Sequence, residues 1–192
     1  SAYTWSKAID EAPYSDWTEF RYNAASVFYR NRSLADHDIP HNFQLGALYE
    51  LPFGKQKKWA TSGLSSTIFG GWQLNGVFAA YSGRPFNLTA SGSSLNMPGN
   101  QQTPDQIKEN VEVLGNVGSD GTYFDTTAFA RVTAVRFGNV GRNTMRGPGV
   151  ANLDLGLFRS FKVRESDLQF RLEAFNATNT PHFSNPNGNV NS

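Results

Sequence analysis

The sequence contains no cysteine in its 192 residues, which excludes disulfide scaffolds, thiol nucleophiles and cysteine-ligated zinc or iron–sulfur sites. It also lacks a charge excess: 17 Lys and Arg against 16 Asp and Glu give a net charge of +1. Nucleic-acid binding needs a basic surplus to neutralise phosphates, so we expect no nucleic-acid partner. No apolar run reaches the roughly 18 residues of a transmembrane helix. The mean hydropathy of −0.46 is nevertheless compatible with a membrane β-barrel, whose strands alternate apolar and polar residues.

Charged residues are also scarce, at 17%, while aromatic residues reach 14% and the chain holds 18 Gly and 9 Pro. Ordinary soluble domains average about 25% charged residues. Abundant aromatic and turn-forming residues favour an all-β protein with long polar loops. The chain opens at Ser1 within a strand-like pattern and shows no signal peptide, so we expect a mature chain or a fragment.

A period of two in hydrophobicity predicts the strands. Between residues 41 and 51, Phe43, Leu45 and Tyr49 share one face, whereas Gln44 and Glu50 share the other. The same argument predicts strands near 1–9, 41–51, 67–90, 150–163 and 167–177, separated by long loops at 10–40 and 91–148. Within the second loop, Thr103 followed by Pro104 predicts a short helix over 104–111.

These elements predict an antiparallel meander of about five long strands that forms part of an outer-membrane β-barrel. Strands of roughly ten residues are long enough to cross a bilayer when tilted. Short turns at 52–58 and 164–167 alternate with the two long loops, and aromatic residues gather near strand ends, as they do in outer-membrane barrels. A soluble β-sandwich would show the same alternation, and the pattern alone leaves both architectures open.

Few residues suggest catalysis or metal binding. His37 and His41 lie four positions apart beside Asp36 and Asp38, but Pro40 disfavours the helix that would place both imidazoles on one face. We interpret them as weak metal candidates in a solvated loop. No serine has the strand–elbow–helix context of a hydrolase nucleophile. We therefore predict no catalytic residue, no cofactor and no metal.

Residues of the long loops are the better candidates for contacts with a ligand. Aromatic rings stack on sugar rings, and arginines attract anionic ligands or lipopolysaccharide. The candidates are Trp17, Tyr22, Tyr29, Tyr123, Arg136, Arg142 and Arg146. Glycines 138, 141, 147 and 149 surround these arginines and are expected to form turns.

Several segments, in order, resemble the Oar-like TonB-dependent receptors, which carry a carboxypeptidase-regulatory-like domain. The segments are 3–7 (YTWSK), 38–43 (DIPHNF), 49–55 (YELPFGK), 70–76 (GGWQLNG), 82–86 (SGRPF), 124–129 (FDTTAF), 138–143 (GNVGRN), 147–149 (GPG) and 168–176 (LQFRLEAFN). The resemblance implies a C-terminal barrel segment in the bacterial outer membrane, in contact with lipid and lipopolysaccharide. It also implies the rest of the barrel and a plug as partners, with TonB engaged only through a more N-terminal part of the receptor.

The function that this resemblance implies is uptake of a bulky substrate, such as a glycan, a peptide or a chelate, without catalysis. An open five-stranded sheet would leave two unpaired edges, so we expect the isolated chain to associate in water. One alternative is a soluble β-rich carbohydrate-binding module whose exposed aromatic residues stack on sugars. A hydrolase with an active site in the 91–148 loop is a further alternative.

Overall fold

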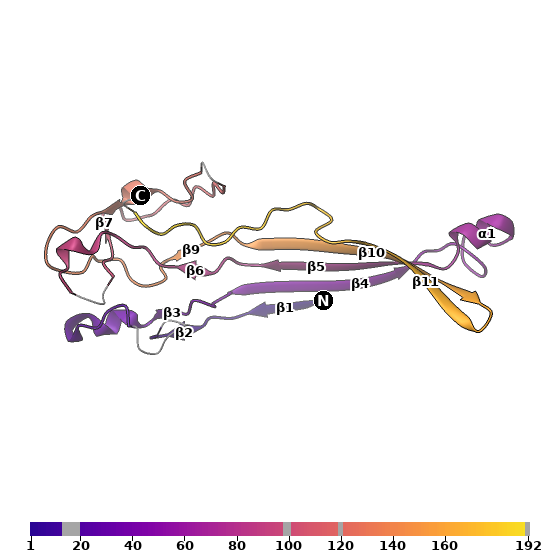
Figure 1. The fold of residues 1–192 in the computed structure, drawn as a ribbon, viewed down its shortest axis with the longest axis horizontal. Helices are drawn as coiled ribbons and strands as arrows, with labels where there is room; N and C mark the ends of the chain where they lie inside the picture. The colour runs from indigo at the N-terminus through magenta and orange to yellow at the C-terminus, as the bar shows by residue number, and fades with distance from the viewer. Residues whose placement is uncertain (13–19, 98–100, 119–120, 191–192) are drawn as a thin grey trace. The chain divides into compact units, whose positions relative to one another are not determined.

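The computed structural model describes residues 1–12, 20–97, 101–118 and 121–190. The chain divides into two compact units. The first, which we call the sheet unit, comprises Ser1–Thr4, Asn42–Ala80 and Ala151–Pro181. The second, the loop unit, comprises Trp5–His41, Tyr81–Val150 and His182–Ser192. Long strands dominate the first unit, and short strands joined by irregular segments make up the second (Figure 1).

Five strands form the main sheet in the order β1-β4-β5-β10-β11. Their bounds are β1 Ala2–Trp5, β4 His41–Glu50, β5 Trp72–Tyr81, β10 Val150–Val163 and β11 Ser166–Ala174. The N–H of Leu51 donates to the Trp72 carbonyl at 2.9 Å, and the N–H of Ser82 donates to the His41 carbonyl at 3.0 Å, so β4 and β5 run antiparallel. β10 and β11 are also antiparallel. The sheet is not closed, and the all-β antiparallel meander predicted from the sequence is confirmed.

The register of the β10–β11 hairpin separates two chemically different faces. Leu157 lies opposite Leu172, and Phe161 lies opposite Leu168, on one face. The other face pairs Phe158 with Arg171, Ser160 with Gln169 and Lys162 with Asp167. The apolar face is exposed: Leu168 and Leu172 each retain 60% of their accessible surface.

Among the described residues, no apolar side chain of the sheet unit is buried, so this sheet has no protein core of its own. An apolar face that lacks a covering protein layer is the pattern of a sheet solvated by lipid. No helix in the described ranges has the length and apolar character needed to cross a membrane.

The connection from β4 to β5 corrects part of the predicted strand 67–90. Helix α1 occupies Gly63–Phe69, and Gly71, with a φ of +77°, reverses the chain before β5 begins at Trp72. The Trp72 indole N–H donates to the Ile68 carbonyl at 3.0 Å, and the guanidinium of Arg159 donates to the carbonyls of Thr67 and Ile68. These bonds satisfy carbonyls at the end of α1, which explains why the cation of Arg159 is tolerated on the apolar face.

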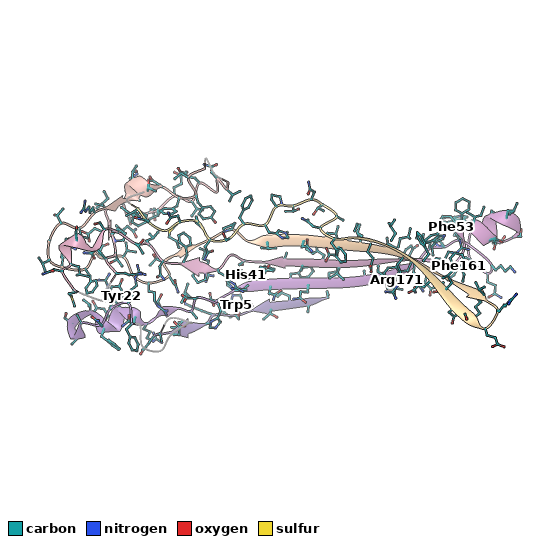
Figure 2. The ribbon with its side chains drawn as sticks, viewed as in Figure 1. Trp5, Tyr22, His41, Phe53, Phe161 and Arg171 are labelled. Carbon is teal, nitrogen blue, oxygen red and sulfur yellow. The ribbon has the colours of Figure 1, made fainter. Side chains whose placement is uncertain are left out.

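Aromatic rings gather at this end of the sheet. The Trp72 ring lies 5.8 Å from that of Phe170 in an edge-to-face arrangement, and the Arg159 guanidinium lies 4.4 Å above the Phe161 ring. Figure 2 shows Phe53 and Phe161 near the same end of the sheet unit. Such rings are typical of the band that outer-membrane strands place at the membrane–water interface.

In the loop unit, segments that were predicted to be long loops form short paired strands and 3₁₀ helices. Three two-stranded sheets pair β2 Ile9–Asp10 with β3 Ser33–Leu34, β6 Pro85–Phe86 with β9 Met145–Arg146, and β7 Asp105–Gln106 with β8 Phe129–Ala130. Its 3₁₀ helices are η1 Ala25–Asn31, η2 Gly92–Ser94 and η3 Thr126–Ala128.

Two further strand boundaries differ from the sequence predictions. The first strand ends at Trp5 rather than near residue 9, because Ile9 pairs with Leu34 in a separate sheet. The strand predicted to reach residue 90 ends at Tyr81, and Pro85 and Phe86 pair with β9 instead.

The helix predicted over 104–111 is wrong. Gln106 pairs with Phe129, and the backbone N–H of Gln106 donates to the Asn139 Oδ1 at 2.6 Å. Pairing with residues distant in sequence therefore overrides the local helix-start signal of Thr103 and Pro104.

The buried apolar side chains lie in the loop unit. One cluster contains Phe86, Leu88, Phe124, Ala128, Phe129, Val140 and Met145, and a second contains Tyr22, Leu95 and Phe137. The loops are consequently held in place by a core of their own, which allows them to position side chains for recognition.

Candidate functional site

Arg142 is a structural residue of the loop unit. Its side chain is 2% exposed and forms an ion pair with Asp10. The guanidinium also donates to the carbonyls of Asn31, Ala12 and Asp10, each at 3.2 Å. Each of the three guanidinium nitrogens donates within the loop unit, so the burial and bonding of Arg142 oppose the predicted contact with an anionic ligand.

Arg146 has a similar internal role. Its guanidinium donates to the carboxylate of Asp38 and to the carbonyls of Asp38 and Gly83, both at 3.1 Å. Asp38 is 1% exposed and also accepts the N–H of Ala8 at 2.6 Å. Burial alone would raise the pKa of Asp38, but the Ala8 N–H and Arg146 lower it below its usual value.

Arg136 is the most accessible of the three arginine candidates. It binds Asp105 in a bidentate arrangement at 2.9 and 2.7 Å, and its side chain stays 53% exposed. The hydrogen bond from Arg136 holds the pKa of Asp105 below its usual value, while burial works against it. A ligand anion would therefore have to compete with a carboxylate that is already in place.

The aromatic candidates divide by exposure. Tyr22, predicted to be exposed, is fully buried, and its hydroxyl donates to the Val140 carbonyl at 2.8 Å. The Tyr22 ring is therefore not accessible to a ligand. Tyr29 keeps 75% of its surface. Tyr123 is half-buried against the larger core cluster, and burial raises the pKa of its phenol. Trp17 lies outside the described residues.

His37 and His41 are both exposed, in a turn and at the start of β4 respectively, without the shared helical face that a two-histidine site needs. In the part of the chain that the structure describes, no group of three or more His, Asp or Glu side chains is placed to hold a metal ion.

The loop unit contains a cavity of about 500 Å³, which we call the asparagine cavity. Its lining comprises Asn116, Val117, Gly118, Gly121, Thr122, Tyr123, Phe124, Thr126, Pro148, Phe183, Ser184, Asn185, Pro186, Asn187 and Asn189. Its volume falls within the range of small-molecule sites, about 300–1,000 Å³. Of the predicted ligand contacts, it includes Tyr123.

One wall of the asparagine cavity comes from residues 116–118, 121–124 and 126. Val113 bridges Phe124, and the N–H groups of Leu114 and Gly115 donate to the Tyr123 carbonyl at 2.9 and 3.1 Å. Gly115 and Gly118 have φ values of +72° and +112°, which residues other than glycine rarely adopt. Phe124 is buried in the core and anchors this wall.

The opposite wall comes from residues 183–189, which the sequence analysis did not identify. Thr89 donates its N–H to the Gly188 carbonyl at 2.9 Å and accepts the N–H of Val190 at 3.0 Å. The Asn185 side chain donates to the Pro85 carbonyl at 3.1 Å. The only local signal is a run of Asn, Pro, Ser and Gly, which indicates a loop but does not show its partner.

Comparison with known proteins completes this description. Searches of curated proteins and of solved structures found no match. A family model described as an outer membrane beta barrel domain matches residues 1–192. The match agrees with a sheet whose apolar face has no protein cover. The chain belongs to the outer membrane beta barrel domain family and is a protein of the bacterial outer membrane.

Proposed function

We propose that the chain is part of a TonB-dependent receptor of the Oar-like type, which imports a bulky substrate across the outer membrane. In this proposal the sheet unit forms part of the barrel wall, and the loop unit supplies substrate contacts. The remaining barrel, a plug and TonB are the protein partners, and lipopolysaccharide surrounds the wall. The chain itself performs no catalysis.

The distribution of apolar side chains is the observation that carries this proposal. Among the described residues of the sheet unit, no large apolar side chain is buried, as a lipid-facing wall requires. The loop unit, by contrast, buries two clusters of apolar side chains, which give its long segments a core of their own. A barrel that served only as an anchor would have no need of loops with their own core.

The resemblance of nine ordered segments to Oar-like receptors supports the finer assignment. The soluble carbohydrate-binding module is not retained, since the chain belongs to an outer-membrane family. No described residue favours the hydrolase alternative over transport.

Uptake measurements test the proposal. A strain lacking the gene that encodes this chain should lose growth on, or accumulation of, one class of bulky substrate, and re-expression should restore it. Removal of TonB, or collapse of the proton-motive force, should abolish the same uptake while surface binding of the substrate persists. Uptake that continues unchanged without TonB would contradict the proposal.

A further inference from the structure

We propose that the asparagine cavity binds an uncharged sugar. This inference rests on the proposed receptor function and narrows its substrate to a neutral glycan. The cavity is lined by residues 116–118, 121–124 and 126, by Pro148, and by residues 183–187 and 189, all within the loop unit.

The described lining of the asparagine cavity carries no formal charge. Apart from the phenol of Tyr123, no ionisable side chain lines the cavity in the described part of the chain. Anionic chelates and peptide carboxylates are recognised by Arg or Lys, and cationic ligands by carboxylates. The carboxylate of Asp125, between the lining residues Phe124 and Thr126, is already engaged, since it accepts from Lys108 at 2.6 Å and from the Thr127 hydroxyl at 2.6 Å.

The cavity lining is rich in neutral donors and acceptors, because Asn, Thr and Ser side chains make up much of it. Asn116, Thr122 and Ser184 are exposed, so their polar atoms are accessible to solvent or a ligand. A carboxamide both donates and accepts, as does a hydroxyl, which matches the hydroxyl groups of a sugar.

Two aromatic side chains contribute apolar surface to the asparagine cavity. Tyr123 and Phe183 border the cavity from its two walls, and Phe183 retains 38% of its accessible area. Ring faces of this kind pack against the C–H faces of a pyranose and bury apolar area without demanding charge. Amide and hydroxyl groups beside exposed rings therefore fit a sugar better than a chelate or a charged peptide end.

Both walls of the asparagine cavity are held by contacts with the rest of the loop unit. The core residue Phe124 holds one wall, and the bonds of Thr89 to Gly188 and Val190 hold the other. The lack of a side chain at Gly147 leaves room for Asn185, because a Cβ added at Gly147 would lie 2.2 Å from the Asn185 Oδ1. A site that is already formed loses less free energy to ordering when a ligand binds.

The test uses the complete outer-membrane protein, purified in detergent. Its binding is measured by calorimetry with neutral oligosaccharides of glucose, xylose, mannose and galactose, with a ferric siderophore and with an oligopeptide as comparison ligands. We expect one of the sugars to bind. Phe183→Ala and Thr122→Val should each weaken that binding about tenfold, whereas Phe183→Tyr should preserve it.

Tyr29→Ala serves as the control, because it removes an aromatic ring that does not line the cavity and is more exposed than Phe183, at 75% against 38%. Heat-modifiable migration on gels reports that each variant is folded. Binding of none of the sugars, or sugar binding that Phe183→Ala and Thr122→Val leave unchanged, would overturn the inference.

These outcomes are distinct from a failure of the proposed function, because equilibrium binding in detergent needs no TonB. Sugar binding without TonB-dependent uptake would reject the receptor and keep the sugar site. TonB-dependent uptake of a peptide or chelate without sugar binding would reject the sugar site and keep the receptor.

Discussion

The guanidinium of Arg146 binds the carboxylate of Asp38 across 108 residues of sequence, and the side chain of Asp38 is 1% exposed. The same guanidinium reaches the Gly83 carbonyl at 3.1 Å, so one side chain connects three segments of the loop unit. Two of the segments lead to long strands, since Asp38 precedes β4 and Gly83 follows β5. The pair therefore connects the loop segments that precede β4 and follow β5 in the sequence.

Arg146→Ala should loosen the loop unit. Removing one partner of a buried ion pair costs about 3–5 kcal/mol, and the 31% exposure of the Arg146 side chain places the expected loss near the lower end. In the complete protein, proteolysis of the loops should accelerate. Arg131→Ala is the control, because Arg131 is exposed and, among the described residues, bonds the Ser91 and Ser93 hydroxyls alone. Equal cleavage rates in the two variants would count against this role of Arg146.

Acid should also loosen the loops. Asp38 and Asp105 have folded-state pKa values below their ordinary value, so both stabilise the loops fully above the unfolded pKa of about 3.9. This stabilisation is lost as the pH falls through the lowered pKa values. Hydrogen exchange of the loop amides, corrected for intrinsic rates, should stay constant from about pH 7 to 5 and rise below about pH 4. Asp105→Asn should flatten that rise; an undiminished rise would show that other groups cause it.

A charge on the apolar face of β11 should oppose membrane insertion. Leu172 lies opposite Leu157, midway along β10, whereas Gln169 projects from the other face of the same strand. Leu172→Lys should destabilise the folded protein in lipid vesicles by about 2–4 kcal/mol, and Gln169→Lys much less. Urea titration of folding in vesicles measures both. The assignment of faces would be reversed if Gln169→Lys were the more damaging change.

A methyl group at Gly138 should disrupt the loop unit. A Cβ there would lie 2.1 Å from the Thr103 carbonyl oxygen and 2.3 Å from that of Pro104. Gly138→Ala therefore forces two backbone segments apart and should increase loop proteolysis strongly, since backbone clashes are relieved only by moving the chain. Gly92→Ala is the matched control, because a Cβ at Gly92 meets nothing within 4 Å. Normal resistance of Gly138→Ala to protease would contradict this packing.

The isolated 192-residue chain should associate in plain buffer and disperse in detergent. Its sheet exposes an apolar face on β11 and ends in two edge strands, β1 and β11, which can pair with other copies. Size-exclusion chromatography with light scattering, with and without detergent, measures this directly. A monodisperse monomer in buffer would show that the apolar face finds cover within the chain.

The sequence by itself determined the strands and their faces. The alternation of Leu168, Phe170 and Leu172 with Gln169 and Arg171 is local, since successive side chains of a strand point to opposite sides whatever the strand pairs with. An apolar face and a polar face therefore follow from the order of residues, and this alternation fits a membrane wall and a soluble sandwich alike.

Only the tertiary structure decided what the long loops do. Tyr22 and Arg142 resemble exposed binding residues in the sequence, yet contacts with Val140 and Asp10, more than 100 positions away, bury them. The second wall of the asparagine cavity likewise depends on the pairing of Thr89 with Gly188. Hydrogen bonds between distant segments leave no periodic pattern in either segment, so the residues that face a ligand emerge only when the loops have folded together.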